Sequence, residues 1–269
     1  MIRQTLANTQ AATFCIELPN QQQHGMPVPT GTGFFISPDG WFATAAHVIT
    51  ENQQSDGAVR RDLDQAWLQK ETRVAGGMPG ELCQYVSFGH IIPRMDFALL
   101  KVDFPKNANK AWLSGKTAFP FIGVSSRLLT EGESVYSSGY PLSSAIAENL
   151  GSMITVTESL CPRVTSAIVS STIEKTRMLI TGNDPKVYVL DKALNYGNSG
   201  GPIICTETGR VHAFCSRFQP VFIPQSHLLD ANQNPIHIMV PSLYGVVFGL
   251  GHHQILGLLR QIGVPIYDD

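Results

Sequence analysis

Short apolar runs separated by turn residues dominate the hydrophobic pattern of this chain of 269 residues. Runs rich in β-branched and aromatic residues are typical of strands, and Gly, Pro and Asn between them are typical of turns. Such runs include residues 135–141, 186–190 and 210–215. The pattern therefore predicts an all-β fold.

The C-terminal end departs from this pattern because its apolar residues follow a helical period. Ile255, Leu258, Leu259 and Ile262 recur at i, i+3, i+4 and i+7, and Gly263 follows them. This spacing places the four side chains on one face of a helix, and glycine is common just after a helix ends. We expect a helix that packs on the second half of the protein.

Two strand-like segments lie next to residues that can transfer or direct a proton. Residues 31–48 predict two strands joined by a turn at 38–40, and the second strand leads into His47. Asp96 stands immediately before the apolar run 97–102. An imidazole can act as a general base, and a carboxylate can hold it in one tautomer and stabilise its protonated form. His47 and Asp96 are therefore the candidate base and its orienting partner.

A glycine-rich turn at 197–202 supplies the candidate nucleophile, Ser199. A serine hydroxyl needs a base to remove its proton and N–H donors to stabilise the oxyanion that its attack creates. Because glycine adopts backbone conformations that other residues avoid, the N–H groups of Gly197 and Ser199 can converge on one point. The same hexapeptide is also compatible with an ordinary Asn-Ser-Gly turn between two strands.

These segments, in the order His, Asp, Ser, resemble the catalytic motifs of trypsin-like serine proteases, in particular of their bacterial HtrA-like or glutamyl-endopeptidase-like branch. The matching segments are Thr44–His47, Asp96–Lys101 and Gly197–Pro202. Subtilisins and α/β-hydrolases carry the three residues in other orders. The resemblance implies a serine endopeptidase that cleaves protein or peptide substrates through the triad His47, Asp96 and Ser199, without a cofactor.

The resemblance also implies the architecture, which is two packed six-stranded antiparallel β-barrels of the chymotrypsin-like type. The first barrel, residues 1–117, would carry His47 and Asp96. The second, residues 118–269, would carry Ser199 and the C-terminal helix. The separations, 96 − 47 = 49 and 199 − 96 = 103 residues, leave room for this division.

By the same resemblance, the primary specificity pocket has a floor at Ala193, followed by Leu194 and Asn195, and a wall at Ser216, Arg217 and Phe218. A pocket for Lys or Arg would need a buried carboxylate at its floor, and none stands there. We expect cleavage after uncharged residues, while Arg217 keeps an acidic substrate residue open. Ser216 also matches the family serine that bonds the triad aspartate, and a strand serine bonded to water is the alternative.

Composition excludes several other classes of function. A net charge of −2 with 19 Lys and Arg residues offers no basic surface for nucleic acid. The first 15 residues lack the apolar stretch of a signal peptide, and no run is long enough to span a membrane, so we expect a cytoplasmic protein without membrane contact. The five cysteines have irregular spacings and are expected to be buried thiols. His252 and His253 lack further ligands at suitable spacing, so no metal site is expected.

Several segments bear on regulation and on the surface. In secreted digestive relatives, an aspartate before the nucleophile pairs with an N-terminus released by cleavage, whereas Asn198 has no charge to do so. We therefore expect restraint by narrow specificity, by a regulatory protein partner or by a mobile loop. Residues 141–163 and 219–235 are the expected mobile loops. A polar decoration is expected at 52–70, with a short helix over 62–70.

Two other functions remain compatible with the sequence. A protease fold without turnover would serve as a binding module, although such proteins usually lose a triad residue or the oxyanion glycine, and all of these are present here. A non-peptide ester hydrolase is the second alternative, because the same triad cleaves esters more easily than amides.

Overall fold

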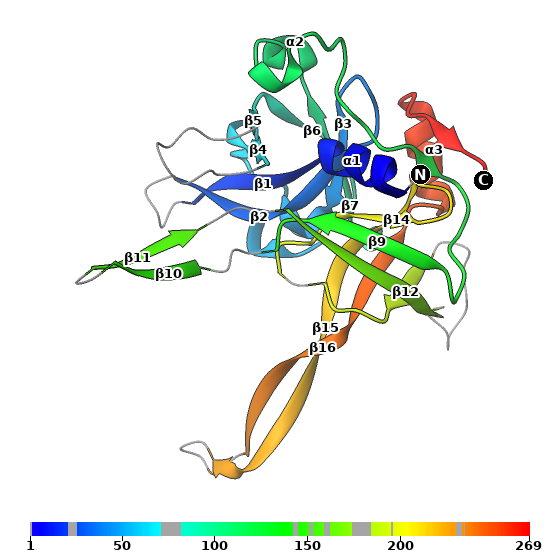
Figure 1. Cartoon of the computed structure of the whole chain (residues 1–269). Helices are drawn as coiled ribbons and strands as arrows, with labels where there is room; N and C mark the ends of the chain where they lie inside the picture. Colours follow the sequence, from blue (N-terminus) through cyan, green and yellow to red (C-terminus); the bar gives the residue numbers. More distant parts are fainter. Residues whose placement is uncertain are drawn as a thin grey trace.

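The protein is built around two large β-sheets, with short helices at their margins (Figure 1). The computed structural model describes residues 2–20, 26–70, 82–141, 145–150, 153–158, 162–173, 184–194, 196–229, 233 and 235–269. Within 217–229 and 235–243 it describes the backbone only. The prediction of an all-β fold is confirmed.

The first sheet is antiparallel and has the strand order β5-β4-β1-β2-β3-β7-β6. Its strands are β1 (Thr13–Asn20), β2 (Met26–Phe35), β3 (Trp41–Ala45), β4 (Trp67–Gln69), β5 (Leu82–Cys83), β6 (Val86–Ile92) and β7 (Phe97–Val102). Within the described residues this sheet has two edges, β5 and β6, and so differs from the six-stranded barrel that the sequence predicts. In the link between β5 and β6, the backbone N–H of Gln84 donates to the side chain of Asn107 at 3.0 Å, and the same side chain donates to Gln84 O at 2.8 Å. The side chain thus occupies backbone groups that strand pairing would use.

The second sheet closes into the predicted six-stranded barrel. Its ring runs β14-β9-β12-β13-β16-β15, and the antiparallel pairing of β14 with β15 closes it. Short parallel pairings add β8 and β17 to the ring at β15. The strands are β8 (Val124–Ser125), β9 (Ser134–Gly139), β12 (Arg163–Ile173), β13 (Val187–Leu190), β14 (Pro202–Cys205), β15 (Val211–Leu229), β16 (Pro235–Gly249) and β17 (Ile266–Tyr267). A unit boundary between residues 117 and 118 stays a prediction.

The larger hydrophobic cluster joins the two sheets. It contains Phe97 of β7 and Phe214 of β15, whose ring centroids lie 5.6 Å apart. A separate cluster, which includes Val135 and Leu190, fills the barrel. The shared cluster holds the two sheets together at the place where the candidate site lies.

The predicted C-terminal helix is present as α3 (His253–Gln261). The other two α-helices of the described residues are α1 (Ile2–Ala12) and α2 (Phe104–Asn107). Ile255 and Leu259 of α3 are buried in the cluster that both sheets share. The helix therefore packs on the second barrel, as expected, and on the first sheet as well. The reason is that β16 leads into the helix at the joint between the two sheets. There the ring centroids of Phe248 and Phe214 lie 6.2 Å apart. Within the described residues, no helix has the length and apolar character needed to cross a bilayer.

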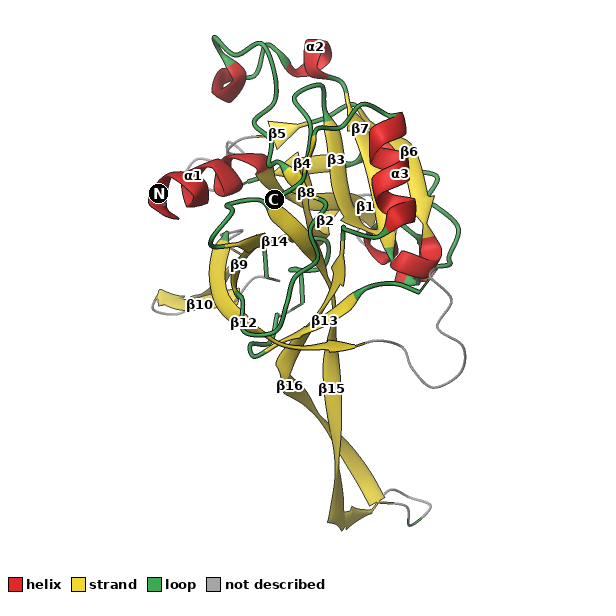
Figure 2. Ribbon diagram, turned by 90° about the vertical axis from the view of Figure 1, so that its right-hand side faces the viewer, coloured by secondary structure: helices red, strands yellow, loops and turns green. Residues whose placement is uncertain are grey.

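Two segments that the sequence predicts as mobile loops contain β-hairpins. One consists of β10 (Ala145–Leu150) paired with β11 (Met153–Glu158). The other is a two-stranded arm, residues 219–229 and 235–243, in which β15 and β16 continue beyond the barrel (Figure 2). Pro220 and Pro241 stand opposite each other there. Proline argues against a central strand, but each strand of an isolated pair has a free edge that needs no donor.

The segment 62–70 is not the short helix that the sequence predicts. It forms a 3₁₀ turn at Leu63–Gln65 followed by β4, which pairs with β1. Leu68 lies opposite Ile16 and is fully buried. Strand pairing and burial therefore override the local preference of this segment.

Candidate active site

His47 and Asp96 meet because the strands next to them are paired. His47 lies in a 3₁₀ turn directly after β3, and Asp96 directly precedes β7, with Ala45 opposite Phe97 in the register. Nδ1 of His47 lies 2.8 Å from Oδ2 of Asp96, and the backbone N–H of His47 donates to Oδ1 at 3.0 Å. The sheet thus fixes both the backbone and the ring of the histidine against the carboxylate.

Asp96 is buried, with 1% exposure, and hydrogen bonds surround its carboxylate. Besides His47, the hydroxyl of Ser216 donates to Oδ2 at 2.5 Å and that of Ser55 donates to Oδ1 at 2.8 Å. Burial raises the pKa of Asp96, but the hydrogen bonds from His47 and Ser216 and the attraction to His47 outweigh it, so the pKa lies below its ordinary value. The carboxylate is ionised at neutral pH. It therefore requires a proton on Nδ1 of His47 and leaves Nε2 able to accept one.

Asp96 also has an uncommon backbone conformation, with φ of 49° in the left-handed region. Its carbonyl accepts a hydrogen bond from Ala46 N at 2.8 Å. Such conformations persist where surrounding contacts hold them, and they gather at functional sites.

Ser199 lies in a tight turn between the sheets. Its hydroxyl donates to the carbonyl of Ser216 at 3.3 Å. Gly197 and Gly200 have φ of 89° and 85°, and a Cβ on Gly200 would lie 2.2 Å from the carbonyl oxygen of Thr32. In the part of the chain that the structure describes, the N–H groups of Gly197 and Ser199 have no hydrogen-bond acceptor. Both donors are therefore free for a ligand.

Two residues near these groups were not singled out from the sequence. Ser55, in the loop after His47, reaches Asp96, and Thr32, on β2, contacts the turn around Ser199. Thr32 lies within the Gly-Thr-Gly start of a motif that otherwise signals only a strand. Nothing local marks either hydroxyl, because each bond joins segments far apart in the chain.

The predicted specificity residues are placed as follows. Ser216 is buried and bonds Asp96, as the resemblance implies. Ala193 is half-buried, while Leu194 is buried in the cluster that fills the barrel. Asn195 and the side chains of Arg217 and Phe218 lie outside the described residues. A role for these residues in specificity stays a prediction.

The comparison with known families agrees with this geometry. The model of the trypsin-like peptidase domain matches residues 31–213, which contain His47, Asp96 and Ser199. The chain belongs to the trypsin-like peptidase family.

Individual trypsin-like relatives include HtrA proteins. Over 180 residues, which are 66% of this chain, it is 28% identical to serine protease HTRA1A of Danio rerio, and the match covers 28% of that protein. Two solved structures share the fold with a TM-score of 0.54 each. The active form of the Rv3671c protease from M. tuberculosis is 21% identical, and the match covers 98% of this chain and 86% of the Rv3671c chain. The HtrA-type protease AlgW with tripeptide is 17% identical, and the match covers 98% of this chain and 65% of the AlgW chain.

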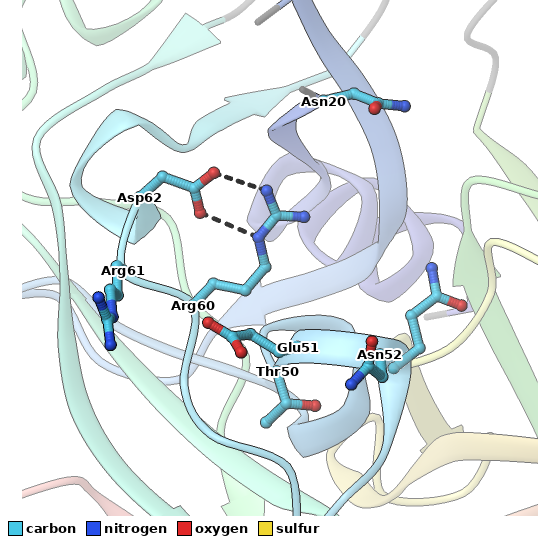
Figure 3. Close-up of a pocket in the computed structure, with 8 residues that line it drawn as sticks. Asn20, Thr50, Glu51, Asn52, Arg60, Arg61 and Asp62 are labelled. Carbon is cyan, nitrogen blue, oxygen red and sulfur yellow. Dashed lines mark hydrogen bonds and ion pairs between the residues drawn. The ribbon is translucent and has the colours of Figure 1, made fainter. Parts of the chain in front are cut away.

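A polar pocket of about 820 Å³ lies beside the loop that follows the histidine of this trypsin-like domain (Figure 3). Its lining comes from Asn20 at the end of β1, from residues 50–53 and from residues 60–62. Arg60 forms a two-pronged ion pair with Asp62, through Nε at 2.9 Å and Nη2 at 2.6 Å. The pocket is therefore on the His47 side of the site, and its central arginine is already neutralised.

The described residues contain one cluster of possible metal ligands, and their cysteines are candidate thiolate nucleophiles. Glu133, Cys205 and Glu207 place possible ligand atoms within 4.8 Å of one another, but the Arg127 guanidinium donates to Glu133 at 2.6 Å and to Cys205 at 3.6 Å. Cys15, Cys83, Cys205 and Cys215 are buried thiols, as predicted, and Cys161 lies outside the described residues. Burial and the charge of Asp96 raise the pKa of the Cys215 thiol, so it does not compete as a nucleophile.

Proposed function

We propose that this chain is a serine endopeptidase with Ser199 as nucleophile, His47 as base and Asp96 as the residue that orients His47. The observation that carries the proposal is the hydrogen-bonded pair His47–Asp96 beside a serine turn with two unoccupied backbone donors. Membership of the trypsin-like peptidase family supports the same reaction class.

In this mechanism the ionised carboxylate of Asp96 holds the Nδ1 proton of His47, so that Nε2 takes the proton of Ser199 as Oγ attacks the substrate carbonyl. The carbonyl oxygen becomes negative and accepts hydrogen bonds from the N–H groups of Gly197 and Ser199. His47 then returns the proton to the leaving amine. Water repeats the sequence and releases the acyl group from Ser199.

One movement is required before attack. The hydroxyl of Ser199, which donates to Ser216 O at 3.3 Å, must turn toward His47. Catalytic hydrogen bonds are often long or misdirected in a free enzyme and shorten when substrate binds. The observed hydroxyl direction is therefore compatible with the proposal.

The substrates that we propose are proteins or peptides, and a regulatory protein partner would fit a protease that is not activated by cleavage. A binding module and an ester hydrolase are the competing functions. The complete set of His47, Asp96, Ser199 and Gly197 favours an active enzyme over a binding module. Family membership favours peptide substrates over simple esters.

Labelling with a fluorophosphonate probe, together with hydrolysis of a proteome-derived peptide library, tests the proposal. Wild type should label and cleave, and Ser199→Ala or His47→Ala should lower kcat by roughly 10⁴- to 10⁶-fold without loss of fold. Ser87→Ala, which removes an exposed serine hydroxyl on β6, is the matched control and should behave as wild type. Wild type that neither labels nor cleaves would be a binding module, and hydrolysis of esters but of no peptide would indicate an ester hydrolase.

A further inference from the structure

Thr32 of β2 is fully buried and uses all of its polar groups at the joint between the sheets. Its backbone N–H donates to Ser199 O at 2.8 Å, and its carbonyl accepts from the hydroxyl of Thr44 at 2.8 Å. Its hydroxyl lies 2.6 Å from Gly197 O and 2.9 Å from Tyr140 N. Two of these four contacts, those to Ser199 O and Gly197 O, reach the turn that carries the nucleophile.

The direction of the two hydroxyl bonds follows from the chemistry of the partners. A carbonyl oxygen can only accept, so the hydroxyl proton of Thr32 points to Gly197 O. A backbone N–H can only donate, so Tyr140 N occupies a lone pair of the same oxygen. With both roles assigned, the hydroxyl has one orientation and cannot rotate to serve another partner.

These contacts fix the turn that presents the oxyanion donors. Three successive carbonyls in the turn are each held by one hydrogen bond. The carbonyls of Gly197 and Ser199 are held by the hydroxyl and the N–H of Thr32, and Asn198 O is held by Gly201 N at 2.8 Å. Since a peptide group is planar, fixing a carbonyl fixes the N–H of the next residue, and Asn198 O thereby directs the N–H of Ser199. The hydroxyl of Thr32 restrains the residue on the other side, Gly197, whose φ of 89° lies in a region where glycine moves easily.

We propose that Thr32 is a positioning residue for the oxyanion hole, and that its hydroxyl holds the turn at 197–199 so that the N–H groups of Gly197 and Ser199 converge on the substrate oxygen. The proposal rests on the proposed peptidase function. Thr32 touches neither substrate nor reacting atoms and acts through the backbone of Gly197. Preorganised donors stabilise the transition state because they need no rearrangement during the reaction.

Kinetics of the purified full chain separate this role from a purely structural one. Thr32→Val keeps the shape of the side chain but removes the hydroxyl, and Thr32→Ser keeps the hydroxyl. Removal of one oxyanion donor typically costs about 10²- to 10³-fold in kcat. Loosening the turn should cost less, so we expect Thr32→Val to lower kcat about 10- to 100-fold with KM changed less than about threefold. Thr32→Ser should stay within about threefold of wild type.

A second readout reports the oxyanion hole directly. A peptide aldehyde forms a hemiacetal with the nucleophile and places its oxygen in the hole, so its affinity should fall in Thr32→Val by a factor similar to that of kcat. Thr13→Val is the matched control, because it also removes a buried hydroxyl that donates to a carbonyl, Thr9 O at 2.7 Å, away from the turn. It should lower the melting temperature without lowering kcat.

The outcomes distinguish this proposal from the one on which it rests. If wild type cleaves peptides and Thr32→Val keeps kcat and aldehyde affinity within about threefold, Thr32 is not a positioning residue, although the peptidase function stands. If Thr13→Val loses as much kcat as Thr32→Val, the effect is structural and the proposal fails. If wild type shows neither labelling nor cleavage, both proposals fail. Should Thr32→Val not fold by circular dichroism, Thr32→Ala is measured against the same limits.

Discussion

Two buried carboxylates show how the surroundings of a residue decide its charge. Around Asp96, four hydrogen bonds from His47, Ser55 and Ser216 replace the lost water, and against the effect of burial the bonds from His47 and Ser216 keep the pKa low. Glu17 on β1 is 8% exposed, and burial alone raises its pKa to about 7. Asp96 is therefore ionised at neutral pH, whereas ionisation of Glu17 destabilises the folded state as the pH rises.

Replacement of Glu17 by glutamine should stabilise the protein at pH 8 and have little effect near pH 4. Because the pKa rises from 4.5 to about 7 on folding, the folded state binds more protons between these values. Stability therefore falls as pH rises through that window. The shift, 7 − 4.5 = 2.5, corresponds to about 3 kcal/mol above pH 7, and Glu17→Gln removes this penalty. Thermal unfolding of both proteins at the two pH values measures it.

The control for this prediction is Glu51→Gln, since Glu51 is exposed. It should leave the pH dependence unchanged. An equal gain in melting temperature for Glu17→Gln at pH 4 and pH 8 would show that the charge of Glu17 is not the cause.

The arm is the element that departs most from the barrel. In the barrel, β15 is joined to β16 by pairs such as Ala213 with Gly249 and Cys215 with Val247, which lie before the arm begins. Beyond Phe218 the two strands pair, among the described residues, only with each other, and they extend away from the body (Figure 1). The barrel therefore does not depend on the arm for its closure.

Shortening the arm should leave the barrel folded. In a variant with residues 220–241 replaced by Asn-Gly, which favours a tight hairpin turn, we expect the melting temperature to change by less than about 3 °C and fluorophosphonate labelling to persist. Val247→Ala, a change in the barrel part of the same hairpin where Val247 is fully buried, should lower stability by about 1–3 kcal/mol. Loss of folding in the shortened variant would mean that the arm contributes to the barrel.

At the scale of the whole molecule, the joint between the sheets carries both stability and the candidate site. The larger hydrophobic cluster crosses this joint at Phe97 and Phe214, and Thr32 and Ser199 are bonded across it. Neither sheet can separate without exposing the shared apolar side chains and breaking the turn at Ser199. The two sheets should therefore behave as one cooperative unit.

Calorimetry should accordingly show a single unfolding transition whose calorimetric and van't Hoff enthalpies agree. Phe214→Ala removes a ring with 1% exposure and should lower the free energy of unfolding by about 3–5 kcal/mol. The variant should still unfold in a single transition. Fluorescence and far-UV circular dichroism recorded on the same samples should give coincident curves. Two resolved transitions, in wild type or in the variant, would contradict a shared core.

The sequence by itself determined the all-β class, the C-terminal helix, the family and the positions of His47, Asp96 and Ser199. Each of these features depends on residues that are contiguous in the sequence, through an alternating or helical period or a short motif. The catalytic roles given to the three residues stay a prediction. The first helix, which docks through Thr9 and Tyr136 at 3.0 Å, carries no comparable signal, because a short helix depends on what it packs against.

Tertiary structure alone decided the contacts of the Thr32 and Ser55 hydroxyls, the strand at 67–69 and the arm. Thr32 meets Gly197 across 165 residues and Ser55 meets Asp96 across 41. A single threonine or serine has no pattern that reveals its distant partner. Likewise, Trp67–Gln69 is a strand because β1 lies beside it, and the prolines of the arm are tolerated because an isolated pair of strands has free edges. Such properties belong to contacts between distant segments, and they exist only once the chain has brought those segments together.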